Sequence, residues 1–186
     1  MSRSIGLAVA LLLAVPFTTL AQEPAKPGKE HAELKKLEGV WDAVMKMAEA
    51  PEPMPGVVTY KMECDGMWLT SDFKMDVPGF KFQGRGTDGY DQNKKKYVGF
   101  WVDSMSSAPM IMEGTMDPAT KTTTMTGEGP GMNGTPIKMK NVSTWTSADS
   151  MTLEVFVVMP DGEEKKSMTI TYTRRAEAGR GPGAKK

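Results

Sequence analysis

From residue 39 to residue 174, hydrophobic and polar residues alternate along the chain with a period of two. This alternation is typical of β-strands that bury one face and expose the other. The run at 97–104 is almost continuously apolar, so we expect that strand to be buried on both faces, or nearly so. The pattern as a whole predicts ten strands, at residues 40–48, 56–65, 67–77, 80–89, 96–104, 109–117, 121–128, 136–147, 150–160 and 164–174.

The connections between these runs are short. Asp65-Gly66 and Asp161-Gly162 are typical of two-residue hairpin turns. No connection is long enough for a crossover helix, so consecutive strands are expected to pair antiparallel in sequence order. Closing such a sheet removes its two edges, and glycines inside the strands supply the bends that a small barrel needs. We therefore expect an all-β fold, an antiparallel up-and-down barrel of about ten strands, with a short N-terminal helix at residues 31–37.

The two ends of the chain are expected to lie outside the barrel. Residues 1–21 have the features of a cleavable signal peptide, namely the basic Arg3, an apolar stretch and small residues before a predicted cut after Ala21. The apolar stretch is short for a bilayer span, so a retained anchor is the less favoured alternative. We expect a secreted or periplasmic protein with no membrane span after processing, in which residues 22–29 form a flexible linker, 30–175 the barrel domain and 176–186 a disordered tail.

Composition narrows the set of partners and cofactors. The chain of 186 residues carries 23 basic and 23 acidic side chains and stays near neutral without Arg3, which argues against nucleic acid as a partner. Cys64 is the only cysteine, so an internal disulfide is excluded. The only histidine, His31, precedes the barrel on a helix that we expect to be solvated. Histidine triads, most zinc sites and haem ligation are therefore not expected, and we predict no cofactor and no metal site.

Methionine is the unusual residue of this chain, with 17 copies, many of them on the inward side of the predicted strands. Thioether side chains repack around irregular ligands, which favours a pliable apolar cavity. The alternative is that methionine fills a solid core, because it substitutes readily for leucine. A copper(I) site would favour clustered methionines, which this sequence lacks. The residues predicted to line a ligand cavity are Met45, Met47, Tyr60, Met62, Phe73, Phe82, Met110, Met112, Met139 and Asn141.

A few polar residues are placed where they could orient a ligand inside the barrel. Asp103 and Ser104 end the apolar run, and Ser143 shares the inward side of its strand with Asn141. The alternative is that these groups bond to one another or to buried water. An enzyme that uses Asp103 with Tyr90 or Tyr97 is the least favoured interpretation, and we assign no catalytic residue.

Two motifs carry a resemblance to known families. Gly39-Val40-Trp41 stands at the entry to the first strand and Arg174 at the end of the last, on the inward side. The chain resembles the calycins in this respect, which implies that Trp41 closes the barrel base and that Arg174 packs over its ring as a cation–π contact.

The segments GYDQNKKKYVGFWVDSM and EGTMDPATKT resemble a secreted bacterial group, the domain-of-unknown-function family 1579, which is grouped with calycin-like barrels. The resemblance covers residues 37–174 and implies the fold and secretion, but it brings no established activity. The connection at residues 49–55 is too short for the two-helix lid of fatty-acid-binding proteins. We therefore expect an open mouth, or one covered only by loops such as 129–135.

Taken together, these features predict a barrel whose interior binds a small apolar or amphipathic molecule. The alternative is a structural or protein-interaction module whose barrel is packed solid and whose hairpin ends make the contacts. An interior void of at least roughly 300 Å³ favours the first, and a filled interior favours the second. Neither the ligand nor the oligomeric state is specified by the sequence.

Overall fold

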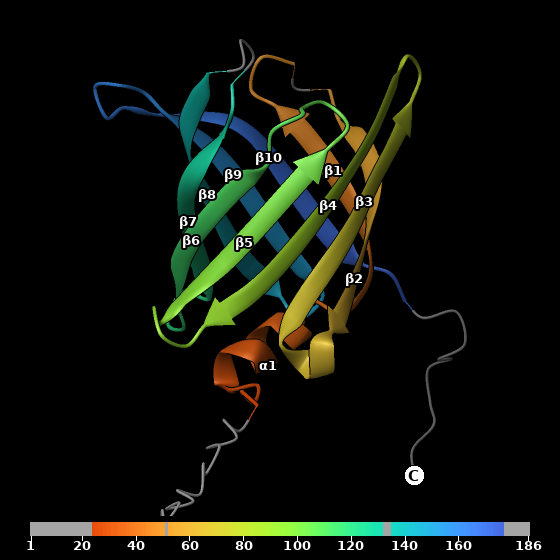
Figure 1. The fold of residues 1–186 in the computed structure, drawn as a ribbon. Coiled ribbons are helices and arrows are strands. Elements are labelled where there is room, and N and C mark those ends of the chain that lie inside the picture. Colours follow the sequence, from red (N-terminus) through yellow and green to blue (C-terminus); the bar gives the residue numbers. More distant parts are fainter. Residues whose placement is uncertain (1–23, 51, 132–134, 177–186) are drawn as a thin grey trace, which may run out of the picture.

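The structure is a computed structural model that describes residues 24–50, 52–131 and 135–176. Its elements follow one another in the order expected from the sequence (Figure 1). They are α1 (Lys29–Lys35), β1 (Gly39–Met47), β2 (Met54–Glu63), the 3-10 turn η1 (Cys64–Gly66), β3 (Trp68–Val77), β4 (Phe80–Asp91), β5 (Lys96–Asp103), β6 (Met110–Asp117), β7 (Thr122–Pro130), β8 (Pro136–Ser147), β9 (Ser150–Val158) and β10 (Glu164–Arg174).

The ten strands form one closed barrel in the order β1-β10-β9-β8-β7-β6-β5-β4-β3-β2. Every neighbouring pair is antiparallel, and β1 closes the barrel on β10 with Trp41 opposite Arg174. In Figure 1, α1 lies at one end of the barrel, which we call the helix end; the opposite end is the far end. The predicted fold class is therefore confirmed. No helix among the described residues is long and apolar enough to cross a membrane.

Several local expectations differ from the structure. The run at 97–104 is not buried on both faces, because Phe100 and Val102 of β5 point outward and are 44% and 40% exposed. The strand expected at 56–65 ends at Glu63, and Cys64 lies exposed in η1. The predicted signal peptide and all but the first residue of the predicted tail lie outside the described residues. Of the predicted linker at 22–29, the described residues up to 28 are coil and α1 begins at Lys29.

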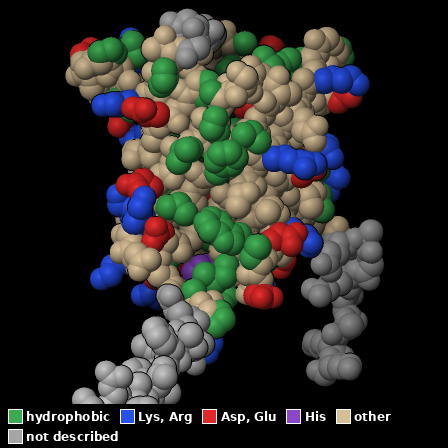
Figure 2. Space-filling view, viewed as in Figure 1, with side chains coloured by type: hydrophobic (Ala, Val, Ile, Leu, Met, Phe, Trp, Pro, Cys, Tyr) green, Lys and Arg blue, Asp and Glu red, His purple; other side chains and the backbone are tan. Residues whose placement is uncertain are grey.

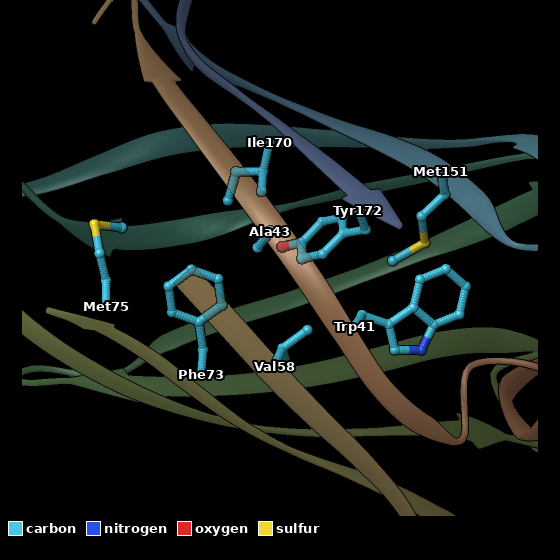
Figure 3. Packing of buried hydrophobic residues seen from close by; sticks show 8 residues of the cluster. All are labelled: Trp41, Ala43, Val58, Phe73, Met75, Met151, Ile170 and Tyr172. Carbon is cyan, nitrogen blue, oxygen red and sulfur yellow. The ribbon is translucent and has the colours of Figure 1, made fainter. Parts of the chain in front are cut away.

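The core of the barrel is built from inward side chains, and its buried cluster comes from five neighbouring strands, β9, β10, β1, β2 and β3. Eight buried residues form its main cluster, and Figure 3 shows them pointing toward a shared interior. Toward the far end, the rings of Phe73 and Phe82 pack with centroids 5.8 Å apart, and those of Phe82 and Trp101 stack at 6.5 Å. The main cluster consists of Trp41, Ala43, Val58, Phe73, Met75, Met151, Ile170 and Tyr172.

Glycines inside β4 and β5 leave room for large inward side chains. A Cβ atom on Gly84 would lie 2.1 Å from the ring of Trp101, and one on Gly99 would lie 2.7 Å from the carboxylate of Asp88. Both distances are too short for a real Cβ contact, so only glycine fits beneath these side chains. Glycine at these positions therefore serves close packing of a neighbouring side chain.

At the helix end, Trp41 and Arg174 bind the chain that leaves α1. The guanidinium carbon of Arg174 lies 4.1 Å from the centroid of the Trp41 ring, and Trp41 is fully buried. Arg174 donates from Nη2 to the carbonyl of Lys36 (2.5 Å) and from Nη1 to that of Glu38 (2.6 Å), and Trp41 Nε1 donates to Leu37 (2.7 Å). Three successive carbonyls of the chain that follows α1 thus accept hydrogen bonds from side chains of β1 and β10.

Gly39 is part of the same arrangement. Its φ of +123° is a conformation that favours glycine, and a Cβ atom there would lie 3.2 Å from Nη1 of Arg174. The glycine and tryptophan of the G-x-W motif therefore each have a physical role, one in making room for the guanidinium and the other in stacking against it.

His31 differs from its prediction. It is 2% exposed rather than solvated, and its ring makes an edge contact with Tyr90 at 6.1 Å between centroids. Its Nδ1 accepts a hydrogen bond from the backbone N–H of Gly28 (2.9 Å), which caps the start of α1. Nε2 is buried without a hydrogen-bond partner among the described residues. Together with the buried Leu34, His31 fixes α1 against the barrel.

Replacing Arg174 by methionine keeps a long apolar side chain but removes the cation–π contact and the hydrogen bonds to the two carbonyls. We expect the free energy of unfolding to fall by about 2 kcal/mol or more, since each bond from a charged donor contributes about 1.5–3 kcal/mol. Chemical denaturation measures the change. The matched control is Arg175→Met, because within the described part of the chain the Arg175 guanidinium pairs with the exposed Asp42 alone, and little loss is expected. Equal losses in the two variants would contradict this assignment.

Candidate functional site

A cavity of about 830 Å³ lies at the helix end, between α1 and the rim of the barrel. Its walls come from α1, from the ends of β4 to β6 and of β8, from the turns that follow β4, β6 and β8, and from β10. Those strand ends contribute inward-facing residues, so the cavity lies at the mouth of the barrel. The lining residues are Lys29, Glu30, Glu33, Lys36, Tyr90, Lys95, Tyr97, Thr115, Met116, Pro118, Lys121, Trp145, Ser147, Ala148 and Arg174.

The inner part of this cavity is apolar and aromatic. Tyr90 and Tyr97 face each other with ring centroids 5.2 Å apart, and Met116 and Trp145 contribute further apolar surface. Burial, and then the charges of Glu30 and Glu33, raise the pKa of Tyr97 to about 12. The phenol is therefore neutral at physiological pH and keeps its proton for donation, as in its contact of 3.9 Å to the Met116 sulfur.

The outer part of the cavity is charged. Its lining contains four lysines and one arginine but only two carboxylates, so positive charge is in excess there. Lys36 pairs with Glu33 (2.5 Å), and Arg174 is bound to Asp149 (3.0 Å) and to the carbonyls described above. This arrangement of an apolar interior and a cationic rim suits a molecule with one apolar and one anionic or polar end.

A half-buried acid lies deeper in the barrel. Asp88 of β4 faces inward, opposite Gly99 of β5 and beside the fully buried Leu69 of β3. Burial raises the pKa of the Asp88 carboxyl to about 7. A carboxyl group in this position is partly protonated at neutral pH, so it can donate a hydrogen bond as well as accept one.

Two phenols and an amide add to the polar groups of the interior. Burial raises the pKa of Tyr60 and of Tyr172 above the usual value. Oδ1 of Asn141 on β8 is buried and has no hydrogen-bond partner among the described residues. A buried acceptor of this kind calls for water or a ligand group.

The residues predicted to line a cavity all belong to the inward side of their strands, but the cavity at the helix end contains none of them. Phe73 and Phe82 are packed against each other in the core, and Met112 is buried. Met47 borders a second hollow of about 430 Å³ on β1 and β10, together with Val44 and Lys166. The remaining predicted residues are Met45, Tyr60, Met62, Met110, Met139 and Asn141, and all of them are half-buried.

The polar candidates do not form one site. Asp103 accepts hydrogen bonds from Trp101 Nε1 (2.8 Å) and from the backbone of Met105 (2.8 Å), so both of its oxygens are occupied at the far end. Ser104 accepts from the backbone of Gln83 (3.2 Å) near the same turn. Ser143 faces inward beside Asn141 on β8.

The pairing of Asp103 with Tyr97 or Tyr90 that an enzyme would need is not formed. Tyr97 and Asp103 are six residues apart on β5, which is about 20 Å in a strand. Among the described residues, no group of three or more His, Cys, Asp or Glu side chains is placed to hold a metal ion.

An apolar patch lies outside the barrel. Phe100 of β5 is directly opposite Ile111 of β6 on the outer face, and Ile111 is 62% exposed. Figure 2 shows hydrophobic side chains gathered in the middle of this face of the molecule. Val102 extends the patch along β5.

The cavity at the helix end was not among the features predicted from the sequence. Tyr90, Tyr97, Met116 and Trp145 are all inward by alternation, but they stand at strand ends, where neighbouring turns complete the wall. The available signal was the position of these aromatic residues beside the turns that follow β4, β6 and β8. It could be used only once α1 was known to lie over those turns.

Comparison with known families gives a match over most of the chain. The family described as "Protein of unknown function (DUF1579)" matches residues 26–174. The chain belongs to this family. The family resemblance predicted from the sequence is thereby confirmed, and it assigns no activity. No curated protein gives a significant match.

Solved structures similar to this member of the family are also β-barrels. The crystal structure of Rv2717c from M. tuberculosis has a TM-score of 0.54 and 10% sequence identity, over 78% of this chain and 96% of that one. The redesigned β-barrel b11L5F_LGL has a TM-score of 0.42 and 13% identity, over 77% and 96% of the two chains. The redesigned barrel mFAP0, bound to DFHBI, has a TM-score of 0.41 and 16% identity, over 75% and 99%. At these identities the likeness is one of fold.

Because the Asp88 pKa is raised on folding, the folded state binds a proton more tightly than the unfolded state. The stability of the protein should therefore fall as the pH rises from about 4 to about 7. Asp88→Asn removes this loss, so the variant should gain on the order of 2–4 kcal/mol relative to the wild type between pH 4 and pH 8. Denaturation at each pH measures the difference.

Asp117→Asn is a control for which the opposite effect on stability is expected. Hydrogen bonds from the Thr120 side chain and the Ala119 backbone lower the pKa of Asp117, so this variant should lose stability near neutral pH and approach the wild type as the pH falls. If NMR shows that the carboxyl carbon of Asp88 titrates near pH 4, burial does not raise the pKa of this group and the prediction is wrong.

Proposed function

We propose that this protein binds a small amphipathic molecule, which enters the barrel interior through the cavity at the helix end. The observation that carries the proposal is the cavity itself, with a volume of about 830 Å³, an apolar interior and a charged rim. Ligand sites in proteins have this size and this combination of apolar walls with a few polar groups.

The position of the cavity also supports the proposal. Its inner wall is made by Tyr90, Tyr97 and Trp145, which are held by strands of a closed barrel and by packing against α1. A wall fixed in this way needs little reordering when a ligand binds, which favours affinity. The half-buried Asp88 and the unpaired oxygen of Asn141 are further polar groups that a longer ligand could reach in the interior.

An interaction module without a ligand is the second candidate. The observation in its favour is the outer patch of Phe100, Val102 and Ile111, since exposed apolar side chains that adjoin one another are common at protein contacts. This candidate predicts no binding of small amphiphiles. The two functions are therefore distinguished by the binding experiment below.

Binding can be measured by calorimetry and by tryptophan fluorescence, because Trp145 lines the cavity. We expect at least one of three amphiphiles with the same decyl chain, namely decyl sulfate, decyl maltoside and decyltrimethylammonium, to bind below its micellar concentration. Ala148→Phe places a ring in the cavity from its exposed rim and should weaken binding about tenfold.

The matched control is Ala108→Phe, because Ala108 is exposed near the far end and lies outside the cavity. It should bind like the wild type. Failure of all three amphiphiles to bind, or equal weakening in both variants, would exclude the proposed function.

A further inference from the structure

Two turns at the helix end have the same sequence pattern and the same local hydrogen bonding. The turn after β4 reads Asp91-Gln-Asn-Lys-Lys95 and the turn after β6 reads Asp117-Pro-Ala-Thr-Lys121, so each begins with aspartate and ends with lysine four residues later. Asp91 Oδ1 accepts from the backbone of Asn93 (2.9 Å), and Asp117 Oδ1 accepts from that of Ala119 (2.9 Å). These are Asx turns, in which the hydrogen bond from the backbone to the aspartate side chain fixes the local backbone conformation.

The last residue of each turn has a left-handed backbone. Lys95 and Lys121 both have a φ of +54°, a conformation in which glycine or asparagine is preferred. Both side chains line the cavity at the helix end. Unfavourable conformations of this kind are often retained where a side chain has a function, so the choice of lysine calls for an explanation.

Lys95 and Lys121 differ from the neighbouring lysines because they form no ion pair with any described residue. Lys94 and Lys96 both pair with Glu113 on the outside of the barrel, which leaves the middle lysine of the run for the cavity. Neither Lys95 nor Lys121 has an ion pair with any residue that the structure describes. Lys121 is also fixed through its backbone, because its carbonyl accepts from the N–H of Trp145 (3.2 Å) in the cavity wall.

The remaining charges at the rim do not neutralise these lysines. Glu33 is paired with Lys36, and Arg174 is occupied by Asp149 and the carbonyls after α1. Lys29 and Glu30 stand together at the start of α1 and offset each other in net charge. The turns therefore present two unpaired positive charges beside an apolar cavity.

We infer that the cavity selects an anionic amphiphile, whose head group binds between Lys95 and Lys121 while its apolar part packs on Trp145, Met116 and the two tyrosines. This inference rests on the proposed function and names the class of molecule. A sulfate, phosphate or carboxylate head group would supply acceptors for both ammonium groups. The apolar part would be desolvated in the inner cavity.

The test compares head groups on one decyl chain. Calorimetry of the wild type should give an affinity for decyl sulfate about tenfold or more above that for decyl maltoside, and decyltrimethylammonium should bind most weakly. Raising the salt concentration should weaken only the binding of decyl sulfate. Equal affinities for the sulfate and the maltoside would overturn the inference but leave the proposed function standing.

Variants at the two turns identify the residues responsible. Lys95→Asn with Lys121→Asn suits the left-handed backbone, so the denaturation midpoint should not fall, but the affinity for decyl sulfate should fall about tenfold with that for decyl maltoside unchanged. Lys95→Arg with Lys121→Arg should retain binding. The control Lys81→Gln with Lys94→Gln removes the same charge from residues outside the cavity and should bind like the wild type.

Two further outcomes decide against the inference. A loss of affinity in the control as large as in the asparagine variant would show that net charge, rather than the two turns, attracts the anion. Flotation of the protein with phosphatidylglycerol vesicles, without binding of monomeric decyl sulfate, would show that it recognises an anionic surface and not a single molecule in the cavity. Failure of every amphiphile to bind would remove the proposed function as well.

Discussion

Arg174 contacts both Trp41 and the chain after α1, and this contact holds β1, β10 and α1 together. It joins the first strand to the last, and it supplies hydrogen-bond donors to three successive carbonyls of the chain that follows α1. Because those carbonyls are held, α1 has a fixed position over one end of the barrel. The cavity between α1 and the rim depends on that position, so its shape follows from the same contact.

The two ends of the barrel are built differently. Toward the far end, the ring of Phe82 packs between those of Phe73 and Trp101, and Gly84 leaves room for the Trp101 ring. The helix end instead carries a cavity and a set of charged side chains. The packed core and a cavity, which were expected as alternatives from the sequence, are therefore both present, with the cavity at the helix end.

Alternation with a period of two was sufficient to predict all ten strands and the inward position of Trp41 and Arg174, because side-chain direction in a strand depends only on sequence parity. It could not show that Phe100 faces solvent, since an apolar residue on the outer face looks the same in a sequence as a buried one. It also could not show that His31 is buried, because that depends on where α1 lies. In the sequence, Lys95 is the middle residue of a run of three lysines, and only its backbone angles and the pairing of Lys94 and Lys96 with Glu113 distinguish it from its neighbours.

The pairing of β1 with β10 also has a consequence for the order of folding. Contacts such as that between Arg174 and the carbonyl of Glu38 join residues 136 positions apart, so they form only when nearly the whole chain is available. Hairpins such as β3–β4 are local and can form early, whereas closure of the ring must come late and be slow. Until then β1 has an unpaired edge, which makes the nascent chain most prone to intermolecular pairing just before its last strand is added.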